Sequence, residues 1–304
     1  MSPLPLALRL PVAGVLPLLP ILIGAWVARA HGVSPKAFGP NLAAAVLGIV
    51  LVAFLGRRSW NHPDRLAPVL AVTALALLAA TLLFPSLGGV HRWISLGPVR
   101  LNASAAILPW VLLALWMLLG QARLGLALGL VAMTQVIHIA QPDAGQATAF
   151  AAGVLVLLGT TRSIPRGGRV VGNAIAVTGA ALAWGRADPL TAVPHVERIL
   201  HLAADQGVPW LLAALVALGG LFLPMVHAVA WLRSTRSEAA ALAVCLGAYF
   251  GGALAATELG NFPVPVLGAG AGHVLGWFSA LGILRCSMTP PTQRGEGTDA
   301  PEGR

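Results

Sequence analysis

Charged residues are scarce in this sequence, and their scarcity argues against a water-soluble domain. Only 10% of the 304 residues are charged, whereas 57% are hydrophobic. A soluble domain carries about a quarter charged residues, so this chain could not cover a water-facing surface and lipid must be its outer solvent. The sequence also lacks alternating segments of about ten residues, which barrel strands require. Its apolar runs are long and rich in Ala, Leu and Gly, which predicts an all-α, polytopic bundle of membrane helices.

Cysteine is scarce too, and the basic residues form no cluster. Cys245 lies within an apolar run and Cys286 just after the last one, so neither a disulfide framework nor a metal site is predicted. The net charge of +9 comes from eighteen Arg and one Lys scattered between the apolar runs. Without a basic stripe interleaved with aromatics, this charge favours topology signals and contact with anionic lipid over nucleic-acid binding.

Ten apolar runs predict about ten transmembrane helices. Several have only about 17 residues, near the lower limit for crossing a bilayer. The first run ends near Ala28-Arg29-Ala30, which mimics a signal-peptide cleavage site, but its apolar stretch is too long for one and we interpret it as a span. The predicted spans are 8–28, 40–56, 66–84, 103–121, 124–140, 144–160, 170–185, 208–232, 239–257 and 264–284.

The distribution of basic residues predicts that both termini lie in the cytoplasm. Thirteen would then be inside: Arg9, Arg57, Arg58, Arg65, Arg123, Arg162, Arg166, Arg169, Arg233, Arg236, Arg285, Arg294 and Arg304. Six would be outside: Arg29, Lys36, Arg92, Arg100, Arg186 and Arg198. Cytoplasmic segments are enriched in Lys and Arg, which favours this orientation. We predict one transmembrane domain over 1–285 and a disordered cytoplasmic tail over 286–304, which is rich in Pro, Gly, Thr and Glu.

The acidic residues separate between the two faces as well. Outside the tail, only Asp64 and Glu238 fall on the inner face. The others fall at or near the outer face: Asp143, Asp188, Glu197, Asp205 and Glu258. The positive-inside rule says little about acidic residues, so their clustering is independent evidence that any chemistry takes place at the outer surface.

Three predicted outer segments carry a family resemblance. They are 88–98 (GGVHRWISLGP), 141–147 (QPDAGQA) and 194–200 (PHVERIL). Their patterns and order resemble the SEDS family of bacterial membrane proteins, the FtsW/RodA/SpoVE group, over residues 66–284. Members show G-x-x-R-W-I-x-L-G-P, Q-P-D-x-G-T-A and P-E-x-H-T-D-F on the outer face of a ten-span bundle. This chain is identified as a short, divergent member of that family.

The resemblance implies a function in cell-wall biogenesis during cell division or elongation, in the bacterial cytoplasmic (inner) membrane. The family's activity is peptidoglycan glycosyl transfer, with lipid II, an undecaprenyl-linked disaccharide, as donor and acceptor. A class B penicillin-binding protein is the implied partner protein. Such a reaction needs a carboxylate to take the proton of the attacking hydroxyl, and Arg or a divalent cation beside the leaving diphosphate. No other cofactor is implied.

The resemblance also assigns roles to six residues. Glu197 falls where the family has its catalytic Asp, with His195 beside it. The residues implied in substrate binding are Arg92, Trp93, Asp143, His195 and Arg198, of which the two arginines would hold the diphosphate and Trp93 would stack on a sugar.

The chain departs from the family pattern at several points. Glu197 replaces an Asp, and the Glu of the family's F-Q-P-S-E-L segment is missing from 101–106. The long outer loop before the third motif is reduced to 186–193, and the Ser and Tyr of a C-terminal motif are missing from 264–272. A catalytic group displaced by about 1 Å can lose much of its effect, so these departures bear on activity more than on fold.

Each candidate residue also has a structural interpretation. Trp93 could belong to an interfacial aromatic belt, and Arg92 could extend its side chain to the lipid headgroups. Asp143 could cap the span that begins at 144. Glu197 could lie on a short interfacial helix with a polar face. That face would comprise His195, Arg198, His201 and Asp205.

Three functions therefore remain open. The first is a SEDS-type glycosyltransferase with Glu197 as base. The second is a catalytically inactive relative that binds a lipid-linked precursor or a division partner, which the short outer loop and the missing motif residues favour. The third is a flippase or transporter, which would need ionisable groups at mid-membrane, where only His138, His227, His273 and a few polar residues occur.

Overall fold

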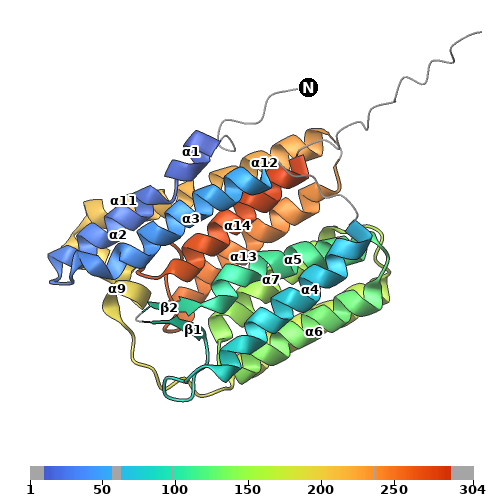
Figure 1. The fold of residues 1–304 in the computed structure, drawn as a ribbon, viewed down its shortest axis with the longest axis horizontal. Helices are drawn as coiled ribbons and strands as arrows, with labels where there is room; N and C mark the ends of the chain where they lie inside the picture. Colours follow the sequence, from blue (N-terminus) through green and yellow to red (C-terminus); the bar gives the residue numbers. More distant parts are fainter. Residues whose placement is uncertain (1–9, 57–62, 98, 236, 289–304) are drawn as a thin grey trace, which may run out of the picture.

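The computed structural model describes residues 10–56, 63–97, 99–235 and 237–288, most of them in helices that run side by side along a bundle (Figure 1). The helices are α1 (Leu10–Val15), α2 (Leu18–Ala30), α3 (Gly39–Leu55), α4 (Pro63–Ala80), α5 (Ala103–Gly120), α6 (Leu124–Ala140), α7 (Ala144–Thr160), α8 (Arg166–Trp184), α9 (Pro194–Glu197), α10 (Ile199–Gln206), α11 (Val208–Gly220), α12 (Leu223–Ser234), α13 (Ala239–Leu259) and α14 (Ala271–Met288), with 3-10 turns η2 (Pro35–Phe38) and η3 (Thr81–Leu83).

Each of the ten predicted spans contains helix, and the polytopic helical fold is confirmed. Within the described ranges, six helical stretches are long and apolar enough to cross a membrane: Val12–Ala30, Pro35–Leu55, Asp64–Leu83, Ala103–Gly120, Val208–Ser234 and Ala239–Leu259. The apolar helices α6 and α7 are shorter, and α8 and α14 are not apolar enough to meet the same criterion. The number of ten spans, the orientation and the domain boundary stay predictions.

The mild hydropathy of α14 is explained by its position in the centre of the bundle. Nearly all of its side chains are buried, because it packs between α3 and α5. Two glycines permit this packing, since a Cβ on Gly48 would lie 2.2 Å from Phe278 and one on Gly276 would lie 2.0 Å from the Ala105 carbonyl oxygen. A helix that faces other helices and not lipid can carry His, Ser and Gly.

The two ends of the bundle are defined by the turns between helices. The outer end, named for its predicted side, holds the turns that follow α2, α4, α6, α8 and α13. The inner end holds the turns that follow α3, α5, α7 and α12. Several residues used in the sequence analysis lie outside the described residues: Arg9, Arg57, Arg58, Pro98, Arg236, Arg294, Arg304 and the tail beyond Met288.

The first motif contains a hairpin that the hydropathy pattern does not predict. Strands β1 (Trp93–Leu96) and β2 (Val99–Asn102) pair antiparallel, with Trp93 opposite Asn102. The hairpin leads directly into α5, whose first turn is capped by the Asn102 side chain through a hydrogen bond of 2.9 Å from the Ala105 N–H. It lies at the outer end of the bundle and does not span it (Figure 1).

The predicted start of the last span, residue 264, is wrong. The last helix, α14, begins at Ala271, and 264–270 forms a buried loop. Pro265 cannot donate a helical hydrogen bond, and Val266 has a φ of 66°, outside the helical region. The segment is apolar because other elements cover it, and hydropathy does not distinguish such a loop from a helix.

Candidate functional site

The three motif segments meet at the outer end of the bundle. The His91 N–H donates to the Gln141 carbonyl oxygen at 3.3 Å, which joins the first segment to the second. Arg92 bonds to Asp188, in the linker that leads from α8 to the third segment. The third segment in turn bonds to the loop 264–270 before α14. Stretches that are far apart in the chain therefore form one cluster.

Arg92 is the centre of this cluster. Its side chain is 3% exposed, and its Nε donates to the Pro142 carbonyl oxygen at 3.0 Å. Its Nη2 also donates to Pro142 and lies 2.5 Å from the Asp188 Oδ2, while the guanidinium lies 5.0 Å from the centroid of the Phe262 ring. A buried side chain does not extend to the headgroups. The predicted role in diphosphate binding stays a prediction, and in this arrangement these donors are occupied.

Asp143 has the capping role that its position predicts. Its Oδ1 accepts from the Gln146 N–H at 3.2 Å at the start of α7, and the same oxygen lies 3.7 Å from the Arg92 Nε. Burial raises the pKa of Asp143, and the charge of Arg92 acts in the opposite direction. The carboxyl therefore connects the helix cap to the buried arginine, and its part in substrate binding stays a prediction.

Glu197 lies at the end of the short helix α9 and is half-buried. Its Oε2 accepts from the Val193 N–H at 2.5 Å, so the carboxylate caps its own helix. Burial raises its pKa, the Val193 N–H and Arg92 lower it, and Asp188 raises it. The charges of Arg92 and Asp188 therefore act on Glu197, although the ion-pair partners of Arg92 in the described part of the chain are Asp143 and Asp188.

A helix is present where the interfacial helix is predicted, but it is broken. Helices α9 and α10 are separated at Arg198, whose guanidinium is exposed and donates to the Asn261 side-chain oxygen at 2.8 Å. The side chain of His195 is half-buried, and burial lowers its pKa, which favours the neutral imidazole. Trp93 is half-buried on the hairpin. The functional roles of these three residues stay predictions.

The loop 264–270 holds α9 in place. The Val196 carbonyl oxygen accepts from the Val264 N–H at 3.1 Å, and the His195 carbonyl oxygen accepts from the Ala269 N–H at 3.0 Å. Gly268 lies so close that an added Cβ would be 2.3 Å from the Val196 oxygen. On the other side of the loop, buried Asn41 of α3 donates to the Gly268 carbonyl at 2.9 Å and accepts from the Gly270 N–H at 2.7 Å.

The sequence analysis did not identify four members of this site: Asp188, Phe262, Asn261 and Asn41. Asp188 was recognised only as an outer acidic residue in a short linker. Its pairing with Arg92 spans 96 positions and has no local signal. Phe262 and Asn261 follow α13 in a segment without a family motif. Asn41 lies within an apolar run, where a buried polar amide needs hydrogen-bond partners, and this need is the signal that could have identified it.

The acidic residues of the cluster do not form a cation site. Asp143 and Asp188 both face the guanidinium of Arg92, so each carboxylate already lies beside a cation of the protein. Among the described residues, no three His, Cys, Asp or Glu side chains are grouped as metal ligands. The described residues of this cluster therefore do not fit a divalent cation.

Two pockets of substantial size lie at the other end of the bundle. A pocket of about 710 Å³ and a neighbouring pocket of about 620 Å³ lie at the inner end of the bundle. Nearer the outer site, an apolar crevice of about 10 Å³ lies between α11, α13 and α14, beside Pro265 and Trp277. This crevice is too narrow for a polyprenyl chain unless these helices separate.

The comparisons with known proteins agree with this architecture. The model of the cell cycle protein family FTSW_RODA_SPOVE matches residues 7–201. The solved structure of the rod shape determining protein RodA from Thermus thermophilus has a TM-score of 0.69 at 19% identity, over 89% of this chain and 93% of that chain. A mutant of that RodA has a TM-score of 0.68 at 19% identity, over 89% and 94%.

A further match is a chain from a study of polymerisation and crosslinking by a peptidoglycan synthase complex. It has a TM-score of 0.64 at 20% identity, over 89% of this chain and 96% of that chain. No curated protein matches this sequence. At these identities, the matched structures show that the fold is shared.

Proposed function

The chain belongs to the FtsW, RodA and SpoVE family of cell cycle proteins, a family of multi-pass membrane proteins, and from this membership we propose that it is a peptidoglycan glycosyltransferase-type protein. It acts in cell-envelope biogenesis at the outer face of the bacterial cytoplasmic membrane. Its substrate is a polyprenyl-linked disaccharide of the lipid II type. The reaction joins the sugar of one such lipid to the sugar of another.

The observation that carries this proposal is the placement of Glu197. The half-buried carboxylate lies on a helix that two backbone hydrogen bonds fix to the loop 264–270, in the cluster where all three motifs meet. Burial raises the pKa of Glu197, which makes its ionised form a stronger base than an exposed glutamate. A carboxylate held in position in this way supports the assignment of Glu197 as the base that takes the proton of the attacking hydroxyl.

The proposed step uses the carboxylate as a general base. The acceptor hydroxyl oxygen bonds to the anomeric carbon of the donor and gives its proton to Glu197. The bond from that carbon to the diphosphate oxygen breaks, and the diphosphate leaves with the electron pair. We infer that Arg198 binds it; its exposed guanidinium, which contacts a neutral amide among the described contacts, supports this role. Arg92, already bound to Asp188, instead maintains the geometry of the cluster.

A second candidate function follows from the same carboxylate. The bond from the Val193 N–H to Glu197 shows that this side chain also serves as a helix cap. Together with the short linker after α8, that structural use favours a protein that binds the lipid-linked precursor without polymerising it. In either case, the similarity to a chain of a peptidoglycan synthase complex supports a class B penicillin-binding protein as partner.

The test is lipid II polymerisation by the purified protein, alone and with a candidate class B penicillin-binding protein. Glu197→Ala should abolish glycan strands, and Glu197→Asp should retain part of the rate. Glu258→Ala is the matched control, because Glu258 is exposed on α13 near the outer end, away from the cluster contacts. Glycan strands from Glu197→Ala would refute the catalytic assignment. Folded wild type that binds lipid II but makes no product would establish the binding function.

A further inference from the structure

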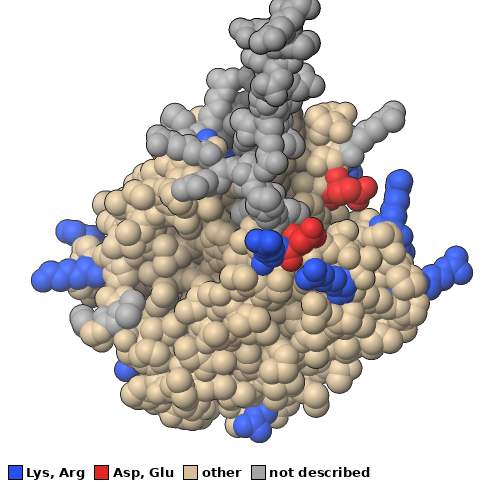
Figure 2. Space-filling model, turned by 45° about the vertical axis from the view of Figure 1, so that its right-hand side comes forward, with Lys and Arg blue, Asp and Glu red and all other residues tan. Residues whose placement is uncertain are grey.

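The larger pocket, of about 710 Å³, lies at the opposite end of the molecule from the proposed active site. Figure 2 shows the side of the molecule toward this end, where basic side chains project with acidic side chains among them. The pocket lies where α7 ends, α12 ends and α13 begins. Its lining residues are Thr160, Arg162, Arg233, Ser237, Glu238, Ala240, Ala241 and Val244.

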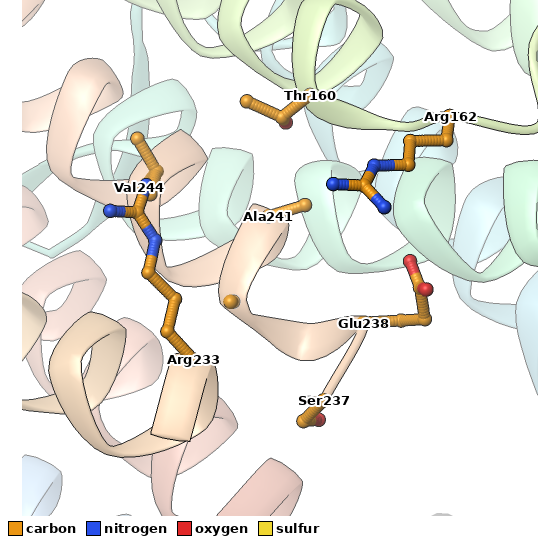
Figure 3. A pocket seen from close by; sticks show the side chains of 8 residues that line it. Thr160, Arg162, Arg233, Ser237, Glu238, Ala241 and Val244 are labelled. Carbon is orange, nitrogen blue, oxygen red and sulfur yellow. The ribbon is translucent and has the colours of Figure 1, made fainter. Parts of the chain in front are cut away.

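Two arginines face this pocket from different helices. Arg162 follows α7 and Arg233 is in the last turn of α12; the guanidinium of Arg162 extends toward Ala241 and that of Arg233 toward Val244 (Figure 3). Within the described ranges, Arg92 is the residue that forms ion pairs, so neither of these arginines has a carboxylate within 4.0 Å. Two cations directed into one cavity favour the binding of an anion there.

The other polar groups of the pocket modify this charge. Glu238 extends toward Arg162 without reaching ion-pair distance and lowers the net charge of the pocket to one positive unit (Figure 3). Ser237 accepts from the Ala239 N–H at 3.3 Å, which leaves its hydroxyl hydrogen free to donate to a ligand. The first turn of α13 adds the positive end of a helix dipole.

One wall of the pocket is apolar. Ala240, Ala241 and Val244 line it along α13, and this helix is long and apolar enough to cross a membrane. A ligand that carries an anionic group and an apolar chain would therefore place the first between the arginines and the second along α13. An anionic phospholipid has this composition, and basic pockets between helices on the cytoplasmic side bind such headgroups.

We propose that this pocket binds the phosphodiester headgroup of an anionic phospholipid of the inner leaflet, between Arg162 and Arg233. The neighbouring pocket of about 620 Å³ shares Arg162 and Glu238 but contains Asp64 and no second arginine. The phosphate therefore binds on the Arg233 side. This site lies outside the glycosyl-transfer chemistry proposed above and does not depend on it.

The test measures binding of dioctanoyl phosphatidylglycerol to the full-length protein in neutral detergent by native mass spectrometry. Arg162→Gln and Arg233→Gln should each raise the Kd about fivefold, which corresponds to about 1 kcal/mol per basic residue at an anionic membrane surface. Arg123→Gln is the matched control, because this exposed arginine at the inner end lines neither pocket. It should change the Kd less than twofold.

A variant that binds the lipid more tightly serves as a control, because misfolding would weaken binding. Glu238→Gln removes the negative charge beside the proposed phosphate and should lower the Kd about twofold or more. An equal loss in Arg123→Gln would overturn the proposal, since binding would then depend on overall charge. So would equal binding of dioctanoyl phosphatidylcholine, or inorganic phosphate that competes at the same concentration as the lipid. An unchanged or raised Kd in Glu238→Gln would also contradict it.

Discussion

Gly268→Ala should displace Glu197 while leaving its carboxylate side chain unaltered, and so test whether activity depends on its position. A methyl group at this position would lie 2.3 Å from the Val196 carbonyl oxygen and 3.1 Å from that of Val264. An ordinary carbon–oxygen contact is about 3.3 Å, so the loop and α9 must move apart by about 1 Å. That movement is transmitted to Glu197, which follows Val196 directly, without any change in its own side chain.

The expected loss follows from this displacement. A misplacement of about 1 Å at a catalytic group can reduce the rate about 100-fold, while overpacking of this kind lowers the free energy of unfolding by about 1–3 kcal/mol. The variant should therefore remain folded in detergent at moderate temperature, with lipid II polymerisation reduced by one to two orders of magnitude. The measurements are the initial rate of glycan formation and a thermal unfolding curve of the same preparation.

The matched control is Gly251→Ala. Gly251 lies in α13, and a Cβ there would meet no heavy atom within 4 Å, so alanine should preserve both activity and stability. Wild-type polymerisation in Gly268→Ala would refute the reasoning, because α9 would then not depend on this loop for its position. Equal losses in both variants would point to a general sensitivity of the bundle to added methyl groups.

Three further predictions concern the charges of the outer cluster. Asp188→Asn removes the nearer of the two charged partners of Arg92 and should lower the free energy of unfolding by about 1–3 kcal/mol, measured by chemical denaturation in micelles. Asp143→Asn keeps a helix cap and removes the charge, whereas Asp143→Ala removes both, so the alanine variant should be less stable by about 1 kcal/mol. Because burial raises the pKa of Glu197, polymerisation should fall as the pH decreases through a pKa higher than that of an exposed glutamate. Val193→Pro removes the N–H donor that lowers this pKa, so it should move the acidic limb of the pH profile to higher pH.

Controls for these predictions come from the same region. Asp205→Asn changes an exposed acidic residue of α10 and should leave the stability unchanged. Equal stability of the two Asp143 variants would contradict the capping contribution. An acidic limb that does not respond to Val193→Pro would show that a group other than Glu197 controls the pH dependence.

The sequence predicted the helical bundle because lipid imposes a strong and local requirement on composition. The ten apolar runs each contain helix, and the motifs were correctly placed at one end. The same criterion failed at 264–270, where the chain is apolar because α2, α3 and α9 cover it. An apolar composition indicates that a segment is buried. It does not indicate whether the backbone hydrogen bonds of that segment follow the helical i to i−4 pattern.

The composition of the site was less predictable than its location. The pairing of Arg92 with Asp188, and the contact of Arg92 with Phe262, join residues separated by many helices. No periodicity links such positions, because their proximity results from how the whole bundle packs. The capping role of Asp143 was predictable, since it depends on the residue's own position before α7.

The pattern of charge pairing supports Glu197 as the proposed base. Asp143 and Asp188 are both engaged by Arg92, so ionisation of either is already used to hold that buried guanidinium. Asp205 and Glu258 are exposed and lie on helices outside the cluster. Among the described outer acidic residues, Glu197 therefore combines partial burial with freedom from an ion pair. If Glu197→Gln retained full polymerising activity in a folded protein, Glu197 would not be the base, and another acceptor, such as the neutral imidazole of His195, would have to take the proton.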